Sequence, residues 1–250
     1  MVKVMIIDFT VIVLRVVMND ETMDVSILEV SENINERSKI IKKIRKFFYH
    51  LVKRIFDFFC AILGIILMIP IMIIVKISYM ITGDFHKIFY KQKRIGKNGK
   101  EIGIYKFRSM VPNAEEELKK LLKKKKYKKE WDLNQKLDND PRITRIGNIL
   151  RKTSLDELPQ FINVLINDMS MIGPRPLVKG ELDAHNGNHK LYESVKPGIT
   201  GWWASHGRST TTYEERLELE YYYVRNVSLW LDIKCIFATI GIVISKTGAK

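Results

Sequence analysis

The sequence predicts an α+β, mostly helical protein that is attached to a membrane. Three observations predict this class: an apolar block runs from Phe58 to Val75, residues 85–110 have the pattern of a β-hairpin, and two later stretches have helical periodicity. The chain of 250 residues is long enough for one substantial domain. Its formal net charge of +14 indicates anionic partners, which are nucleic acid, acidic lipid headgroups or phosphorylated substrates.

Residues 1–46 are interpreted as an N-terminal extension of unknown role that is mobile or loosely docked. The apolar start is interrupted by Lys3, Asp8 and Arg15, and no small-residue cleavage site follows, so no cleaved secretory signal is expected. The chain has 2 cysteines, too few for a disulfide framework or a cysteine-based metal cluster, which fits a reducing compartment.

Residues 47–84 are predicted to form the membrane segment. Pro70 lies inside the apolar block, where its missing N–H and its ring should kink or break the helix. Each arm then has about a dozen residues and a length of roughly 18 Å, whereas a bilayer hydrocarbon core is about 30 Å thick. Lysines and arginines flank both ends of the block, which indicates that both ends lie on the same face of the membrane. These flanking residues are Lys42, Lys43, Arg45, Lys46, Lys53 and Arg54 before the block and Lys87, Lys91, Lys93 and Arg94 after it.

Two alternatives stay open on the residue pattern alone. A kinked helix that crosses the membrane once is as compatible with the pattern as a helix that enters and returns, because proline is tolerated in membrane helices. A buried helix of a soluble core is less favoured, because such helices seldom run this long without a polar face.

A hairpin is predicted from Ile88–Ile95 and Ile102–Phe107, which flank Lys97-Asn98-Gly99-Lys100. Asn-Gly is the preferred central pair of a type I′ turn. The glycines of this region do not have the spacing of a phosphate-binding loop.

Two further helices are predicted in residues 85–250. The lysine-rich stretch Ala114–Trp131 is interpreted either as a helix on an anionic membrane surface or as a solvated charged helix. The stretch Ser228–Ser245 is interpreted as an amphipathic helix, either in the core or at the bilayer interface.

The polar residues that can carry chemistry are concentrated between Asp140 and Pro176. If Asp156 caps a helix, Pro159 falls in its first turn and both carboxylates, Asp156 and Glu157, stand at a helix N-terminus. An acidic pair at this place can also serve only to complement the helix dipole. Several arginines nearby favour a role in binding phosphate.

The motifs of this region occur in a characteristic order. They are Lys106-Phe107-Arg108-Ser109-Met110, Asp140-Pro141-Arg142, Thr144-Arg145-Ile146-Gly147, Leu155-Asp156-Glu157-Leu158-Pro159-Gln160, Asp168-Met169-Ser170-Met171-Ile172-Gly173-Pro174-Arg175-Pro176, Lys196-Pro197-Gly198-Ile199-Thr200-Gly201 and Tyr222-Tyr223-Val224-Arg225-Asn226. With them, the run from Phe47 to Lys250 resembles the bacterial monotopic phosphoglycosyl transferases, also called polyprenyl-phosphate sugar phosphotransferases.

The resemblance implies a role for each matching residue. Asp156 is expected to be the nucleophile that attacks the sugar-bearing phosphate of a UDP-sugar and releases UMP, after which undecaprenyl (polyprenyl) phosphate resolves the aspartyl intermediate. A carboxylate is ionised at neutral pH and needs no base, but its approach to a diphosphate requires cations. Glu157, with Asp156, is expected to bind Mg²⁺. The expected substrate-binding residues are Lys106, Arg108, Arg145, Arg151, Arg175 and Arg208.

The resemblance also implies a membrane topology. It favours a proline-broken reentrant membrane helix in residues 47–84, which makes the protein monotopic, with residues 85–250 as a cytosolic catalytic domain with amphipathic helices at the membrane interface. The expected location is the bacterial cell (inner) membrane, with the active site on the cytoplasmic face. Membrane phospholipids are further expected partners, a homo-oligomer is left open, and nucleic acid is not expected, because no stacking-aromatic motif of a known RNA-binding type is present. Exopolysaccharide or capsule biosynthesis is the expected context.

The sequence departs from the family at two places. The family often has serine before the proline of its membrane helix, where this chain has Ile69-Pro70, and Trp203-Ala204-Ser205-His206-Gly207-Arg208 differs from the usual run after the Pro-Gly-Ile-Thr-Gly motif. The donor sugar therefore stays open. His206 is interpreted as structural, with substrate contact as the alternative, and Asp168 as a cap or turn residue.

Two other function classes are kept. A basic adaptor would bind membranes without catalysis, and a glycosyltransferase would transfer the sugar without its phosphate and release UDP.

Overall fold

The computed structural model describes residues 22–134, 137–207 and 211–245, and the side chains of helix α2 from Glu36 onward. Two compact units are distinguished, residues 1–52 and residues 53–250, and each is described by itself. Helix α2 (Thr22–Ile81) contributes to both units, so no helix boundary falls at residues 46 and 47, where the sequence placed the end of the extension.

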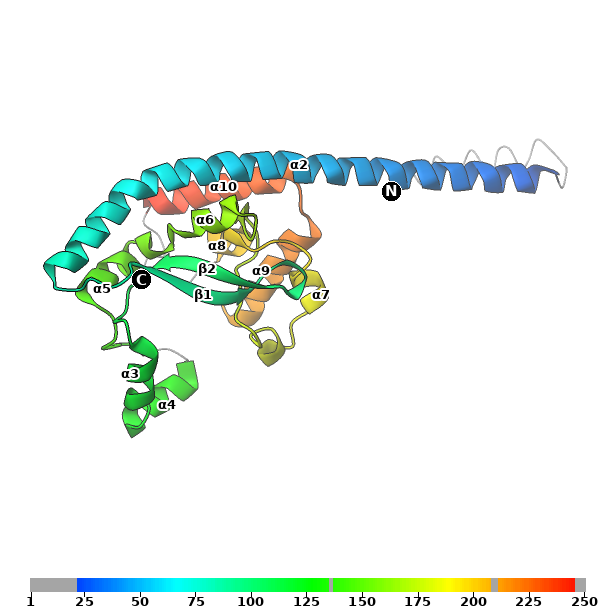
Figure 1. Cartoon of the computed structure of the whole chain (residues 1–250). Coiled ribbons are helices and arrows are strands. Elements are labelled where there is room, and N and C mark those ends of the chain that lie inside the picture. Colours follow the sequence, from blue (N-terminus) through cyan, green and yellow to red (C-terminus); the bar gives the residue numbers. More distant parts are fainter. Residues whose placement is uncertain (1–21, 135–136, 208–210, 246–250) are drawn as a thin grey trace. The chain divides into compact units, whose positions relative to one another are not determined.

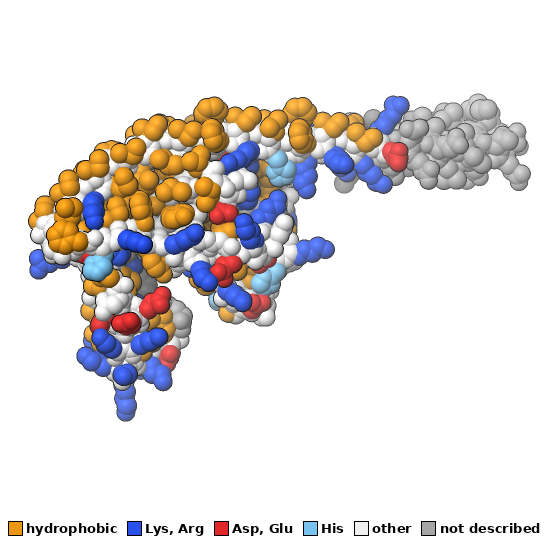
Figure 2. All heavy atoms as spheres, viewed as in Figure 1, with side chains coloured by type: hydrophobic (Ala, Val, Ile, Leu, Met, Phe, Trp, Pro, Cys, Tyr) orange, Lys and Arg blue, Asp and Glu red, His pale blue; other side chains and the backbone are white. Residues whose placement is uncertain are grey.

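Helix α2 has one buried face and one exposed apolar face from Asp57 to Tyr79. Ala61, Met68, Val75 and Tyr79 are at most 4% exposed and recur at helical spacing, so they bury one stripe against the domain. The opposite face exposes large apolar side chains, which are Phe59, Leu63, Ile66, Leu67, Ile73, Ile74 and Ile77. Figure 2 shows hydrophobic side chains gathered over α2 and α10. A contiguous apolar surface of this size marks an interaction with a membrane or a protein.

Pro70 does not interrupt α2. The helix continues through it to Ile81, so the predicted division into two separate arms is not present as a break in the helix. The last turns of α2 do point away from the direction of the part that runs beside α10 (Figure 1), and a proline that removes a backbone hydrogen bond is a common cause of such a change. Within the described residues, Glu36–Ile81 is the one helical stretch long and apolar enough to cross a membrane.

Three polar side chains of α2 attach it to the rest of the domain. Lys53 Nζ lies 2.9 Å from Asp232 Oδ2. The Arg54 guanidinium donates to the carbonyls of Val164 and Leu165, both at 2.8 Å. Lys53 and Arg54 are therefore bound to protein, and they do not belong to the free basic flank on which the same-face argument was built.

Asp57 is the third of these attachments. Its carboxylate accepts the backbone N–H of Met171 at 2.9 Å and the hydroxyl of Ser170 at 3.1 Å. The carboxylate is 4% exposed, so these donors compensate for its burial.

The predicted hairpin is confirmed. Strand β1 (Phe89–Ile95) pairs antiparallel with β2 (Glu101–Phe107), with Phe89 opposite Phe107 and Ile95 opposite Glu101. Asn98 (φ 57°, ψ 32°) and Gly99 (φ 74°) have the left-handed conformations of a type I′ turn, and Lys100 N–H donates to the Lys97 carbonyl at 3.3 Å.

The remaining elements are short helices and a second small sheet. They are α3 (Ala114–Leu121), α4 (Lys125–Asn134), α5 (Arg145–Lys152), a 3₁₀ turn (Leu155–Glu157), α6 (Gln160–Leu165), β3 (Ser170–Ile172), a second 3₁₀ turn (Asp183–His185), α7 (His189–Tyr192), β4 (Gly198–Thr200), α8 (Trp202–His206), α9 (Tyr213–Arg225) and α10 (Leu229–Ser245). The predicted single helix over Ala114–Trp131 is thus two helices. Figure 1 places them on the side of the hairpin away from α2 and α10, which favours the solvated interpretation of their lysines. The amphipathic helix predicted near the C-terminus is α10.

Strands β3 and β4 are parallel, with Ser170 opposite Gly198 and Ile172 opposite Thr200. A Cβ on Gly173 would lie 2.4 Å from the Lys196 carbonyl oxygen, and one on Gly201 would lie 2.1 Å from the Gly173 oxygen. Backbone segments therefore touch at these glycines, which explains two glycine-containing motifs of the sequence.

Candidate active site

The acidic pair lies in the 3₁₀ turn Leu155–Glu157, immediately before α6. The N-cap of α6 is Pro159 and no side chain caps it, so the predicted role of Asp156 as a helix cap is wrong. Ser154, which precedes the turn, has φ 55°, a left-handed conformation that costs a non-glycine residue energy and is common at functional sites. The turn leaves Asp156 half-buried and Glu157 exposed.

The side chain of Asn163, in α6, attaches this region to the backbone of strand β2. Asn163 is fully buried, accepts the backbone N–H of Tyr105 at 2.9 Å and donates to the Gly103 carbonyl at 2.8 Å. The amide thus pairs with the outer edge of β2. Lys106 follows in the same strand, and its Nζ reaches Glu157 Oε1 at 2.8 Å.

Burial raises the pKa of Asp156, and the negative charge of Glu157 raises it further. Lys106 and Arg151 act in the opposite direction and lower that pKa. Arg151 is itself positioned by a hydrogen bond from its Nε to Ser109 Oγ at 2.8 Å. The carboxylate therefore stands between a like charge and two cations, which is the kind of electrostatic environment found at reactive groups.

A cavity of about 310 Å³ adjoins Glu157 and Lys106. Two more cations line it, Arg94 from β1 and Arg175 from the segment after β3. Burial lowers the pKa of Arg94, and the positive charge of Arg175 adds to this, so the two guanidinium groups lie in one electrostatic neighbourhood. The sequence argument did not select Arg94 for this site, because its place in a basic strand next to the apolar block suggested a membrane flank.

The other lining residues come from segments far apart in the sequence. They are Ile104, Gln160, Gly173, Pro176, Gly198, Ile199, Thr200, Gly201, Trp203, Ala204, Glu220, Thr239 and Ile242. Thr239 and Ile242 belong to α10, whose exposed apolar residues include Phe237 and Ile240. The cavity wall is therefore continuous with a helix that takes part in the apolar face.

Glu220 of α9 is the second acidic residue of the cavity wall and was also missed. It is 1% exposed; its Oε1 accepts the backbone N–H of Arg175 at 3.0 Å, and its Oε2 has no partner in the described part of the chain. Burial raises its pKa to about 7, although the Arg175 N–H and the charges of Arg216 and Arg175 lower it. Its spacing from Arg216, Leu217, Tyr223 and Val224, all buried on α9, is the signal that could have placed it inside.

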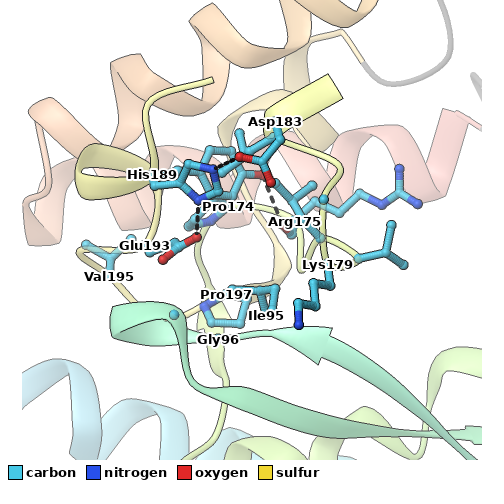
Figure 3. A pocket seen from close by; sticks show the side chains of 16 residues that line it. Ile95, Gly96, Pro174, Arg175, Lys179, Asp183, His189, Glu193, Val195 and Pro197 are labelled. Carbon is cyan, nitrogen blue, oxygen red and sulfur yellow. Dashed lines mark hydrogen bonds and ion pairs between the residues drawn. The ribbon is translucent and has the colours of Figure 1, made fainter. Parts of the chain in front are cut away.

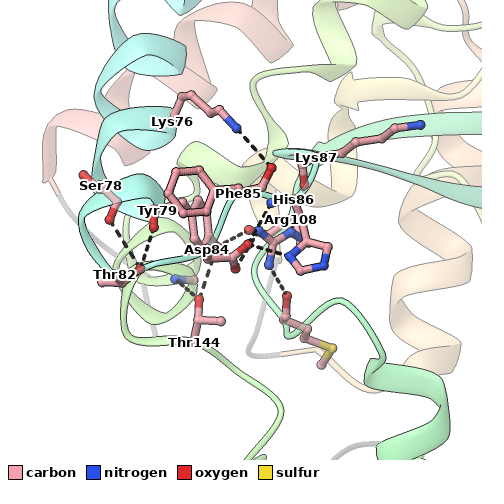
Figure 4. A network of polar contacts seen from close by, with 12 residues as sticks. Lys76, Ser78, Tyr79, Thr82, Asp84, Phe85, His86, Lys87, Arg108 and Thr144 are labelled. Atoms are coloured by element: carbon pink, nitrogen blue, oxygen red, sulfur yellow. Dashed lines mark hydrogen bonds and ion pairs between the residues drawn. The ribbon is translucent and has the colours of Figure 1, made fainter.

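Arg108 lies elsewhere, in a structural network (Figure 4). Its Nε donates to the Lys87 carbonyl at 2.9 Å and its Nη1 to the Met110 carbonyl at 3.1 Å, while Nη2 lies 2.9 Å from Asp84 Oδ2. The guanidinium also stacks over the ring of Tyr79, 4.4 Å from its centroid. With 8% exposure and these partners, Arg108 joins α2 to the hairpin, and its predicted substrate contact has no support in this geometry.

The other predicted residues divide into two groups. Lys106, Arg151 and Arg175 surround the acidic pair or line its cavity, as described above. Arg145 is the exposed first residue of α5 and is not among the described residues that line the cavity. Arg208 lies outside the described residues.

Two neighbouring residues have structural roles. Asp168 lies in the turn after α6, 3.6 Å from Lys100, as its interpretation as a turn residue predicts. His206 stacks on Trp202 at a centroid distance of 3.7 Å and is not among the described cavity residues, in line with its structural interpretation.

A second cavity, of about 280 Å³, lies between the hairpin turn and α7 (Figure 3). At its edge His189 contacts Asp183 and Glu193, both at 2.8 Å. The hydrogen bonds to Glu193 and Asp183 raise the pKa of His189. Arg175 lines both cavities, so the two cavities are neighbours. His189, Asp183 and Glu193 line only the second cavity, so they are not part of the candidate active site.

The acidic pair suits a hard divalent cation. Within the described residues no group of three histidine, cysteine, aspartate or glutamate side chains could hold a metal ion. Mg²⁺ is usually held by one or two carboxylates together with substrate phosphates and water, so the donors Asp156 and Glu157 fit it without a third protein ligand.

The structure thus combines an exposed apolar face, a cavity lined by cations and a half-buried acidic residue, Asp156, next to Glu157. A family model described as bacterial sugar transferase matches residues 48–246. The chain is 41% identical over 227 residues to the UDP-galactose-lipid carrier transferase of Erwinia amylovora, covering 90% of this chain and 45% of that protein. The same figures hold for the undecaprenyl-phosphate galactose phosphotransferase of Salmonella typhimurium.

The exopolysaccharide production protein ExoY of Sinorhizobium fredii is 38% identical over 198 residues, covering 79% of this chain and 87% of ExoY. The chain thus spans about half the length of the first two relatives and most of the length of the third. It belongs to the bacterial sugar transferase family, the phosphoglycosyl transferases that its motifs resemble.

Proposed function

We propose that the protein transfers a sugar 1-phosphate from a UDP-sugar to undecaprenyl phosphate through a covalent intermediate on Asp156. The observation that carries the proposal is that Glu157 lines a cavity together with Arg94, Lys106 and Arg175, and that Asp156 precedes Glu157 in the same turn. The phosphates of the donor are anions that these side chains can bind, the arginines through bidentate hydrogen bonds and the lysine through a single charged group.

In the first step an oxygen of the Asp156 carboxylate attacks the phosphorus that bears the sugar. The bond from that phosphorus to the bridging oxygen breaks, and UMP leaves with the bond's electron pair. In the second step an oxygen of the lipid phosphate attacks the same phosphorus, which releases the Asp156 carboxylate and leaves a lipid diphosphate sugar. Splitting the transfer in this way lets both substrates use one site in turn.

The protein's own groups have distinct tasks in these steps. Lys106 and Arg151 stabilise the ionised form of Asp156 against burial and against the charge of Glu157. Mg²⁺, held by Asp156 and Glu157, would neutralise charge on the transferred phosphate. Arg175 is oriented through its backbone by Glu220, and α10 brings the lipid phosphate close to the cavity wall.

The apolar face of α2 and α10 supports a monotopic arrangement. A helix packed on protein along one face from Asp57 to Tyr79 presents only its other face to lipid. We therefore place the cavity at the cytoplasmic surface of the inner membrane, in a pathway of exopolysaccharide or capsule type, and keep the reentrant path of α2 as part of the proposal.

Intact-protein mass analysis tests the chemistry. After incubation with a panel of UDP-sugars and Mg²⁺ but no lipid, the wild type should gain the mass of one phosphosugar and release UMP. Asp156→Asn should gain none and should not turn over. Asp168→Asn is the matched control, since the same change falls in a turn outside the cavity, and it should behave as wild type. Turnover without an adduct on Asp156, or release of UDP in place of UMP, would overturn the mechanism.

A further inference from the structure

The part of α2 that precedes the domain has a surface that the proposed transfer does not use. Between residues 39 and 52 the helix exposes large apolar side chains at helical spacing. These are Ile40 (54% exposed), Ile41 (57%), Ile44 (49%), Phe47 (63%), Phe48 (57%), Leu51 (44%) and Val52 (43%).

The same segment has its basic residues on the other side. At about 100° per residue, the apolar side chains fall within an arc of roughly 140°, and Lys39, Lys42 and Lys46 lie opposite. Lys43 and Arg45 border the arc, where long side chains can extend toward headgroups. Figure 2 shows hydrophobic side chains along one side of this part of α2 and basic side chains along the other.

No acidic residue occurs between positions 38 and 52. Among the side chains that the structure describes, none forms an ion pair with the five cations. The segment therefore has an uncompensated positive charge beside an apolar stripe.

We propose that residues 39–52 form an interfacial arm that binds the surface of an anionic lipid bilayer. The apolar stripe enters the boundary between headgroups and acyl chains, and the lysines contact anionic headgroups. This adds a second, charge-dependent attachment to the apolar one made by the following part of α2.

Two features favour lipid over a second copy of the chain. A second copy would bring the same positive charges to the contact, whereas helix pairs are normally held by charges of opposite sign beside the apolar seam. The segment also offers a second copy no carboxylate to pair with its lysines, whereas anionic headgroups supply the opposite charge.

Photocrosslinking of the full-length protein tests the arm. The photoreactive residue benzoylphenylalanine replaces Phe47 on the apolar stripe or, as the matched position, Lys42 on the opposite side. In vesicles of phosphatidylethanolamine and phosphatidylglycerol, the probe at position 47 should give phospholipid adducts and the probe at position 42 should give several-fold fewer. A crosslinked dimer at position 47, or equal lipid adducts at both positions, would overturn the proposal.

Charge variants test the requirement for anionic lipid. Replacing Lys39, Lys42 and Lys46 by glutamine should lower the adduct yield at position 47, because each lysine near an anionic surface changes partition about fivefold. Replacing Lys123, Lys126 and Lys128 removes the same charge from the α3–α4 region and should leave the yield unchanged. Vesicles without phosphatidylglycerol should remove the difference, and a yield insensitive to both lipid and lysines would refute the charge-dependent arm. These readouts are independent of transferase activity.

Discussion

The buried carboxyl group of Glu220 predicts how the stability of the domain changes with pH. Its pKa in the folded protein is about 7, against an ordinary value of 4.5, because burial disfavours the charged form. An acid whose folded pKa is raised stabilises the fold while it is protonated, so this contribution is present below the ordinary pKa. It is lost as the pH rises through the folded pKa.

The size of the effect follows from the two pKa values. The difference between about 7 and 4.5 corresponds to about 3 kcal/mol at 1.36 kcal/mol per unit. Glu220→Gln keeps an oxygen that can accept the Arg175 N–H but removes the titration. The variant should therefore differ from the wild type by less than about 1 kcal/mol near pH 5 and be more stable near pH 8, with a melting temperature higher there by roughly 6–12 °C for a domain of this size.

Thermal denaturation of the purified protein in detergent, recorded from pH 5 to pH 8, measures this difference. Glu218→Gln is the matched control, because Glu218 lies on the same helix with its side chain 72% exposed. Its melting temperature should follow that of the wild type at every pH. A difference between Glu220→Gln and wild type that is the same at pH 5 and pH 8 would refute the assignment of a near-neutral pKa to this group.

Three other perturbations have distinct expected outcomes. Glu157→Gln removes the like charge beside Asp156, so the acid limb of kcat/KM should move to lower pH even though the rate itself falls. Arg151→Met should lower kcat/KM about 10- to 100-fold with an unchanged melting temperature, whereas Arg108→Met should lower the melting temperature and leave the activity per folded molecule nearly intact. Asn163→Ala leaves two backbone groups of β2 without partners and should reduce the free energy of unfolding by about 2–4 kcal/mol in denaturant titrations, and an unchanged value would contradict the role of this amide.

Local patterns in the sequence predicted the elements whose structure is decided locally. The Asn98-Gly99 turn fixes its hairpin because few residue pairs adopt two successive left-handed conformations without strain. The helix near the C-terminus follows from its apolar periodicity. The division of the lysine-rich stretch into α3 and α4 was missed, because its lysines favour helix throughout and give no stop signal.

Residues of the candidate site could be predicted from the sequence only where they belong to a recognisable motif. Asp156, Lys106, Arg151 and Arg175 were selected in this way, and the fold brings them into one region. The helical spacing of Glu220 could have assigned it to the buried face of α9, but its place in the cavity wall depends on packing between segments far apart in the chain.

Basic residues were the least predictable class. Arg108 and Arg54 look like free cations in the sequence, yet both bind backbone carbonyls inside the domain. Charge alone does not distinguish a guanidinium that satisfies buried carbonyl groups from one that awaits an anion, because both uses rely on the same donors.

The amide of Asn163 also protects the hairpin from unwanted assembly. An exposed strand edge is a template on which another chain can add a strand, and repeated addition leads to aggregates. Here one side chain occupies the donor of Tyr105 and the acceptor of Gly103, so an incoming strand finds no free pair at the centre of β2. The two-stranded sheet can thereby remain two-stranded when copies of the chain meet.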